Sequence, residues 1–180
     1  KAERAAIAEI NKAGGILGKK VALVEVDTAC NPQTAVDAAN KLINIERVSI
    51  IVGALCSGAS ISAHSNVAKN SNVAMISPAS TSPAITTLSD NDLFFRVVPS
   101  DAFQGKMLAK LVLSKGTKKV ALTWINNDYG KGFADAFKAS YIGGGGKITN
   151  SSGHEEGKAS YRSELATLAK GGADTLVLLA

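Results

Sequence analysis

The chain has 180 residues, of which 46% are hydrophobic and 19% charged, and its formal net charge is +5 at pH 7. This composition is typical of a folded globular protein and excludes an intrinsically disordered one. No apolar run approaches the roughly 20 residues that a membrane helix needs, and the lysines are scattered without interleaved aromatic residues, which argues against a nucleic-acid surface.

Helices and strands are expected to alternate through the first half of the chain. A helix with one apolar face opens the sequence and ends at Gly14 and Gly15. The apolar run 21–26 predicts a strand that is buried on both faces. Asn31 is a good N-cap, and a proline at the next position predicts that a second helix begins there. The next elements are a strand, a helix, a strand and an extended segment, over residues 49–53, 60–69, 73–76 and 94–99.

Ser100 and Asp101 predict the start of a helix, and from there the second half of the chain repeats this alternation. Its later elements are a strand, a helix, a short strand, a helix and a strand, over residues 120–125, 129–141, 147–150, 160–170 and 175–179. Repeated strand–helix–strand units favour parallel sheets with right-handed crossovers. We therefore expect an α/β fold of two lobes, residues 1–99 and 100–180, with a ligand cleft between them. Because the chain opens in a helix and ends inside an apolar run, we also expect it to be a piece of a longer protein.

Two short loops carry the most functional information. One is Leu55-Cys56-Ser57-Gly58 and the other is Ser77-Pro78-Ala79-Ser80-Thr81, and each follows the carboxyl end of a predicted parallel strand. Open α/β sheets bind ligands at that edge. The Ser57 hydroxyl and nearby N–H groups suit a carboxylate, the Thr81 hydroxyl can donate or accept, and the Ala79 carbonyl can accept from an ammonium. Together these groups suit a zwitterion, although the second loop is equally compatible with an ordinary proline-bounded turn.

Catalytic and metal-binding alternatives have weaker support. Ser57 stands at a strand-to-helix turn, as a hydrolase nucleophile would, but the glycine spacing of that motif is absent. The two histidines, His64 and His154, show no ligand spacing with the two cysteines, so no metal site is predicted. The glycine run 143–146 follows a helix and precedes a strand, which is the wrong order for a phosphate loop.

The two cysteines, Cys30 and Cys56, each follow a predicted strand and could lie at the same edge of one sheet. A disulfide between them is geometrically plausible and would indicate an oxidising compartment. Two free buried thiols in a cytosolic protein remain equally compatible with the composition.

Several segments resemble a known family when they are taken together and in order. They are residues 9–18 (EINKAGGILG), 27–32 (DTACNP), 52–57 (VGALCS), 76–81 (ISPAST) and 127–132 (NDYGKG). The chain in this respect resembles the type I periplasmic binding proteins of ABC importers, in the leucine/isoleucine/valine-binding branch. The resemblance implies a fold of two doubly wound parallel-sheet lobes, of which this chain lacks the first strand and the C-terminal part.

The resemblance also assigns roles to particular residues. It implies a disulfide between Cys30 and Cys56, and a ligand carboxylate held by Ser57 and Thr81. The Ala79 carbonyl and the Thr81 hydroxyl would meet the ammonium. Leu55 and Cys56 would border the side-chain pocket, Tyr129 would close over the ligand from the second lobe, and Ser80 stands in the binding loop where a small apolar residue is common. The acidic partner of the ammonium is expected beyond Ala180.

The function expected from these observations is capture of a free amino acid, branched-chain or aliphatic, by closure of the two lobes. The resemblance implies a monomer that delivers its ligand to a membrane permease, in the periplasm or lipid-anchored outside a Gram-positive cell. No cofactor, enzymatic activity, nucleic-acid partner or membrane insertion is expected. The alternatives are a ligand-sensing receptor domain of the same fold and an α/β hydrolase that uses Ser57.

Overall fold

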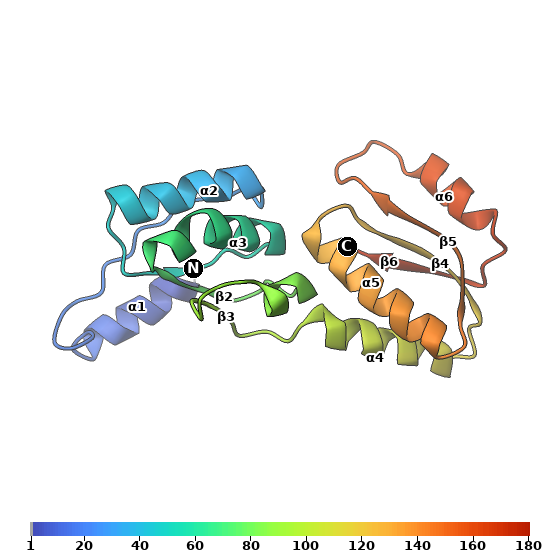
Figure 1. Ribbon diagram of the computed structural model, residues 1–180, viewed down its shortest axis with the longest axis horizontal. Helices are drawn as coiled ribbons and strands as arrows, with labels where there is room; N and C mark the ends of the chain where they lie inside the picture. The colour runs from blue at the N-terminus through green and yellow to red at the C-terminus, as the bar shows by residue number, and fades with distance from the viewer. Residues whose placement is uncertain (1) are drawn as a thin grey trace.

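A computed structural model describes residues 2–180, which form two α/β lobes side by side (Figure 1). The helices are α1 (Ala2–Lys12), α2 (Pro32–Asn40), α3 (Ser57–Ala63), α4 (Asp101–Ser114), α5 (Asp128–Gly143) and α6 (Arg162–Ala169). Short helical turns are η1 (Lys41–Ile45), η2 (His64–Ala68), η3 (Lys69–Ser71) and η4 (Pro83–Thr87). The strands are β1 (Ile50–Val52), β2 (Ala74–Ser77), β3 (Phe94–Arg96), β4 (Lys119–Ile125), β5 (Lys147–His154) and β6 (Thr175–Leu179). We call the part that contains β1–β3 the N-terminal lobe and the part that contains β4–β6 the C-terminal lobe.

Local sequence signals explain where several helices begin. The side chain of Asn31 accepts a hydrogen bond from the Thr34 amide and Pro32 occupies the first position of α2, as the sequence predicts. Asn127 caps α5 in the same way, since its Oδ1 accepts from the Gly130 amide at 2.9 Å. These caps fix the first turns of the helices, and the first turn of α5 faces the N-terminal lobe (Figure 1).

The N-terminal lobe is built on a parallel sheet in the order β1-β2-β3. Ile51, Met75 and Phe94 occupy successive strands in register, and all three are buried. Small residues of α2 and α3, such as Ala35 and Ala59, pack against them in one hydrophobic cluster. The alanines allow these helices to lie close to the short strands, so that the loops after β1 and β2 are held firmly at the sheet edge.

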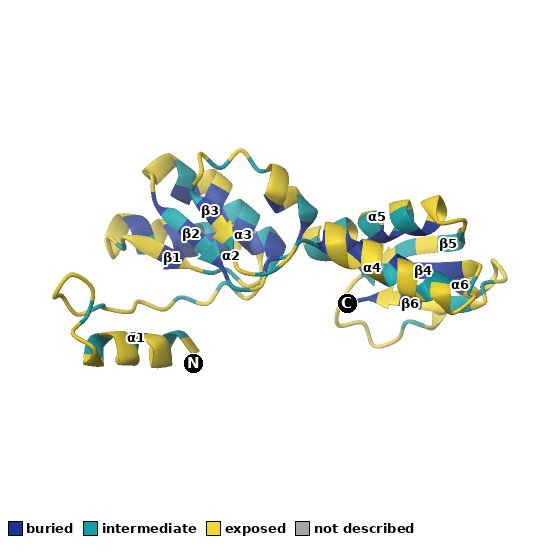
Figure 2. Ribbon diagram, turned by 90° about the horizontal axis from the view of Figure 1, so that it is seen from below, coloured by how far each residue is buried: buried dark blue, intermediate teal, exposed yellow. Residues whose placement is uncertain are grey.

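The C-terminal lobe has a second parallel sheet, in the order β5-β4-β6. Its central strand β4 is almost entirely buried, as a strand covered on both faces should be. Phe133, Phe137 and Tyr141 of α5 pack into the core beside Val120 and Leu122. Figure 2 shows the buried residues gathered within the two lobes, whereas α1 is largely exposed and contains no buried residue.

The predicted strand over residues 21–26 is wrong. This segment has no strand partner among the described residues, and the sheet of its lobe ends at β1. Both the amide and the carbonyl of Val21 bond instead to the side chain of Asn11, at 2.7 and 2.9 Å. An apolar run becomes a strand only where a neighbouring strand accepts its backbone hydrogen bonds, and no such neighbour lies beside it here.

Two other elements differ in extent from the prediction. The helix expected over 60–69 already begins at Ser57 and continues through the turns η2 and η3. The strand expected over 147–150 extends to His154, because β5 pairs with β4 along its whole length. The added residues 57–59 and 151–154 lie at the carboxyl ends of strands, where ligands are expected.

Candidate functional site

Serine hydroxyls hold the two N-terminal loops together. Ser77 Oγ donates to the Ala54 carbonyl at 2.6 Å, and Ser80 Oγ donates to the Leu55 carbonyl at 3.1 Å. Ser60, in α3, bonds to both the Ala54 carbonyl and the Ser80 hydroxyl, at 3.0 and 2.8 Å. The loop after β1 and the loop after β2 therefore form one rigid unit, which we call the serine-locked loops (residues 53–57 and 77–82).

Ser80 makes its side-chain hydrogen bonds inside the N-terminal lobe. Its side chain is fully buried and is engaged with Ser60 and with the Leu55 carbonyl. Its amide donates to Ser77 Oγ at 3.0 Å. Ser80 thus fixes the shape of the site from within the lobe, because its polar side chain faces the neighbouring loop. A small apolar residue at this position could not make these bonds.

Ser57 is placed at the start of α3 and is only 2% exposed. Its Oγ accepts a hydrogen bond from the Ser82 amide at 3.2 Å. Because this partner is a donor, the hydroxyl hydrogen of Ser57 remains available for an acceptor such as a carboxylate. An amide N–H cannot remove a proton, so this contact gives Ser57 no base for nucleophilic attack.

The second loop offers main-chain groups that the fold leaves free. Among residues 2–180, no hydrogen bond uses the carbonyl of Ala79 or the amide of Thr81. The Thr81 carbonyl, by contrast, accepts from the Asp101 amide at 2.8 Å, which ties the loop to the start of α4. Ala79 is exposed and Thr81 half-buried, so one free acceptor and one free donor stand two residues apart at the strand end.

The disulfide between Cys30 and Cys56 is confirmed, with the two Cα atoms 5.4 Å apart. It connects the turn before α2 to the residue that precedes α3. Leu55 beside it is 62% exposed. Leu55 is therefore an exposed apolar side chain next to a residue that the disulfide holds in place.

Asp101, treated in the sequence only as part of a helix cap, is an unusual member of this region. It is fully buried at the first position of α4, and neither carboxylate oxygen has a hydrogen-bond partner among the described residues. Burial raises the pKa of Asp101, while the neighbouring Thr81 side chain and the charge of Arg96 act in the opposite direction. The sequence places an acidic residue after the cap Ser100, but its burial depends on how the two lobes meet, which no local pattern predicts.

Tyr129 comes from the first turn of α5 in the C-terminal lobe. Its ring packs against Phe133, with centroids 6.1 Å apart, and it lines a hollow of about 600 Å³ together with residues of α4 and β6. Burial raises the pKa of Tyr129, and the charge of Asp101 raises it further. Tyr129 therefore lies close to the same carboxylate that borders Thr81, which brings the two lobes' candidate groups into one region.

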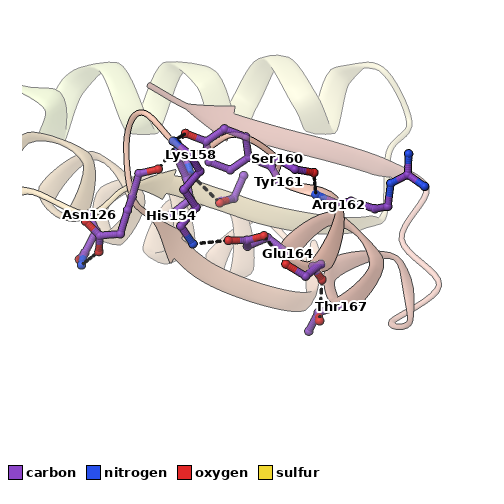
Figure 3. Close-up of polar contacts among 11 residues, drawn as sticks. Asn126, His154, Lys158, Ser160, Tyr161, Arg162, Glu164 and Thr167 are labelled. Carbon is purple, nitrogen blue, oxygen red and sulfur yellow. Dashed lines mark hydrogen bonds and ion pairs between the residues drawn. The ribbon is translucent and has the colours of Figure 1, made fainter.

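A second polar cluster lies at the carboxyl ends of β4 and β5 (Figure 3). His154 Nδ1 is 2.8 Å from Thr123 Oγ1, and the His154 ring meets the Tyr161 ring edge-on, with centroids 5.7 Å apart. The Tyr161 hydroxyl donates to the Glu155 carbonyl at 2.8 Å, and Asn126 donates to the Glu155 carboxylate at 2.6 Å. These groups bond to one another, so the cluster shapes the loop between β5 and α6.

No group of three or more histidine, cysteine or acidic side chains that could hold a metal ion occurs in the described part of the chain. None of the helices in residues 2–180 combines the length and the hydrophobicity that a membrane span requires.

This chain is similar in sequence and in fold to proteins that are already known. A family model described as the receptor family ligand-binding region matches residues 1–180. The chain belongs to this family. Among its curated relatives, the Leu/Ile/Val-binding protein of Escherichia coli K12 is 32% identical over 166 residues, which are 92% of this chain and 44% of that protein. The Leu/Ile/Val-binding protein BraC3 of Rhizobium johnstonii is 40% identical over 141 residues, 78% of this chain and 38% of that protein.

Solved structures of two substrate-binding or leucine-binding proteins show the same fold. The branched-chain amino acid substrate-binding protein LivJ of Streptococcus pneumoniae, in complex with isoleucine, is 33% identical, with a TM-score of 0.84 over 97% of this chain and 49% of that chain. The leucine-binding protein LivK of Thermotoga maritima is 26% identical, with a TM-score of 0.86 over 96% and 49%. The resemblance to the leucine/isoleucine/valine-binding branch and the type I fold are confirmed. The chain spans about half the length of the relatives that it matches.

Proposed function

We propose that the protein containing this chain is the substrate-binding component of an ABC importer. It captures a free amino acid with a branched or aliphatic side chain by closing the two lobes around it. The observation that carries the proposal is the pair of free main-chain groups, the Ala79 carbonyl and the Thr81 amide, beside the Ser57 hydroxyl. Relatives named for leucine, isoleucine and valine support the class of ligand.

Each group has a role in this proposal that follows from its charge. The ligand carboxylate accepts hydrogen bonds from the hydroxyls of Ser57 and Thr81 and from the Thr81 amide. The ammonium donates to the Ala79 carbonyl, and the buried Asp101 carboxylate supplies the negative charge on that side. A buried carboxylate without a partner is unfavourable, so an ammonium next to Asp101 would replace solvation that the fold has removed. In this proposal Asp101 acts on the ammonium together with the acidic residue that is expected beyond Ala180.

The two lobes hold opposite sides of the ligand. Leu55 and the disulfide border its side chain in the N-terminal lobe, and Tyr129 covers it from the first turn of α5. Since contacts from both lobes are made only when the cleft is closed, the ligand shifts the population toward the closed form by its additional contacts there.

The proposal is tested by calorimetric titration of the full-length protein with leucine and two truncated analogues. One is 4-methylpentanoate, which lacks the ammonium, and the other is isopentylamine, which lacks the carboxylate. We expect leucine to bind and both analogues to bind at least a hundredfold more weakly, because each leaves buried polar groups without a partner. Equal affinity for leucine and 4-methylpentanoate would contradict an amino-acid site.

A ligand-sensing receptor domain is the second candidate, and the family model, which describes a receptor region, favours it. The two are separated by measuring leucine uptake in cells that lack the gene. Loss of uptake supports a role with a membrane permease, whereas normal uptake with altered gene expression supports a sensor. The importer proposal also includes a monomeric protein, which light scattering can test. It further includes export to the periplasm or to the outer face of the cell, and the disulfide supports such an oxidising location.

A further inference from the structure

The start of α5 lies against the N-terminal lobe, between α3 and η4 (Figure 1). A glycine stands at two points where α5 comes close to the N-terminal lobe. Gly58 of α3 faces Asp128 of α5, and Gly132 of α5 faces Pro83 of η4. Neither glycine is used by the ligand contacts proposed above.

The spacing at Gly132 leaves no room for a side chain. A β-carbon built there would lie 2.7 Å from Cδ of Pro83 and 3.2 Å from Oγ of Ser82. The three atoms nearest to that β-carbon all belong to the N-terminal lobe, although Gly132 itself belongs to the C-terminal lobe. A side chain at position 132 would therefore affect the distance between the lobes and not the packing within one lobe.

Backbone conformation does not explain the glycine. Gly132 lies within α5 and does not have a positive φ angle. In such a position alanine is the better helix former, so a glycine weakens the helix unless close approach requires it. The close approach of Pro83 therefore explains why a glycine occupies this position.

Gly58 makes a similar but softer contact. A β-carbon there would lie 2.8 Å from Oδ2 of Asp128. Asp128 is exposed and its side chain can rotate away, whereas the ring of Pro83 cannot. We therefore expect the contact at Gly132 to limit the approach of the lobes more strongly than the contact at Gly58.

We propose that Gly132 is a positioning residue for ligand capture, which sets how closely the first turns of α5 approach η4 when the lobes close. The effect on affinity rests on the proposed function, but the effect on lobe distance does not. A methyl group at this position holds the lobes apart, and the groups of the C-terminal lobe then fail to reach a ligand held by the N-terminal loops.

The experiment compares Gly132→Ala with the matched control Gly143→Ala in the full-length protein. Gly143 lies at the other end of α5, and a β-carbon there would meet nothing within 4 Å. We expect Gly132→Ala to raise the Kd for leucine at least tenfold and to lengthen the distance between spin labels at Asn70 and Ala139, one in each lobe. The melting temperature of the ligand-free variant should be unchanged or higher, since alanine favours the helix. Gly143→Ala should leave the affinity and the label distance unchanged.

A rescue variant makes the assignment specific. Because the closest atom is Cδ of Pro83, the double variant Gly132→Ala/Pro83→Ala should recover most of the lost affinity and the original label distance. Wild-type affinity and distance in Gly132→Ala would overturn the proposal, as would a variant that fails to fold, since that outcome would place the constraint within one lobe. If the wild type binds no amino acid, the label distances alone still decide the role of Gly132, and only the proposed function fails.

Discussion

The two lobes contribute to the proposed site by different means. In the N-terminal lobe the main contributions are main-chain groups of the serine-locked loops, whose shape is fixed by hydroxyl-to-carbonyl bonds. In the second half of the chain they are side chains in the first turns of helices, Asp101 in α4 and Tyr129 in α5. A main-chain group is placed by the fold alone, whereas a side chain depends on residue type and on how the lobes meet. The N-terminal lobe is therefore suited to holding the ligand through groups that the backbone itself fixes, whereas Asp101 and Tyr129 act on the ligand through side chains that depend on residue type.

The largest expected difference between the lobes concerns stability, because the disulfide lies in the N-terminal lobe alone. It joins residues 26 apart in sequence, and the chain-entropy model gives about 3–4 kcal/mol for a loop of that size. Replacing both Cys30 and Cys56 with serine should lower the free energy of unfolding of the N-terminal lobe by that amount. Trp124, the single tryptophan, reports on the C-terminal lobe in β4. The unfolding free energy obtained from its fluorescence in urea should fall much less than the opening free energy obtained from hydrogen exchange of the β2 amides. An equal fall in both free energies would show that the lobes unfold as one unit.

The next largest effect concerns the anchor in the N-terminal lobe. Ser57→Ala and Thr81→Ala should each weaken leucine binding by about 1.5–3 kcal/mol, the range for hydrogen bonds to a charged group. The matched control is Thr87→Ala in the same lobe, whose exposed hydroxyl only contacts the Ala84 carbonyl. Calorimetry should show unchanged affinity for the control, and unchanged affinity in all three variants would remove these hydroxyls from the site.

Asp101 should show opposite effects on stability and on binding. Its raised pKa means that the folded protein holds a proton more tightly than the unfolded chain, so this group lowers stability as the pH rises from about 3.9 through the folded pKa. At neutral pH, Asp101→Asn should raise the melting temperature of the ligand-free protein while weakening leucine binding by about 2 kcal/mol. A variant that loses stability and keeps its affinity would show that the carboxylate only caps α4.

Tyr129 distinguishes ligand contact from packing within the C-terminal lobe. Tyr129→Phe keeps the ring contact with Phe133 and removes only the hydroxyl. If the hydroxyl meets the ligand in the closed form, stopped-flow measurements should show release accelerated about fivefold, with capture nearly unchanged. Tyr161→Phe, which removes a hydroxyl that bonds within the loop after β5, is the control and should not change the release rate.

The smallest expected effect is a pH dependence in the N-terminal lobe. His64 is fully buried with its ring edge-on to Phe94, and neither ring nitrogen has a hydrogen-bond partner in residues 2–180. Burial lowers the pKa of His64; the backbone and charge of Asp90 raise it, and Lys69 lowers it further. The unfolded chain therefore binds the proton more readily, and stability should fall as the pH drops below about 6.5 toward the folded pKa.

A thermal melt at pH 5.5 and pH 7.5 measures this effect. We expect a loss of about 1–3 °C at the lower pH that is absent in His64→Phe. Other groups titrate in the wild type and in His64→Phe alike. The effect of His64 is therefore the difference between the two proteins in how far the melting temperature falls with pH. An identical pH dependence in both would exclude His64 as its source.

The parts of the fold that sequence predicted are those set by local chemistry. Asn31 and Pro32 mark the start of α2 because capping depends on the next few residues only. The loops over 55–58 and 77–81 follow strands whose apolar character is unambiguous. The strand predicted over 21–26 failed because it requires a distant partner. The burial of Asp101 and the contact of Gly132 with Pro83 could not be predicted, since both depend on the approach of lobes that are separate in sequence.

The serine-locked loops have a consequence for how such a protein changes its ligand during evolution. No substitution removes a main-chain carbonyl, and only proline removes an amide N–H, so the Ala79 and Thr81 main-chain groups survive nearly every mutation that leaves the serines intact. Mutations around Leu55 and Tyr129 can then alter the preferred ligand side chain one step at a time, without loss of the amino-acid anchor. New specificities become accessible through intermediates that still bind.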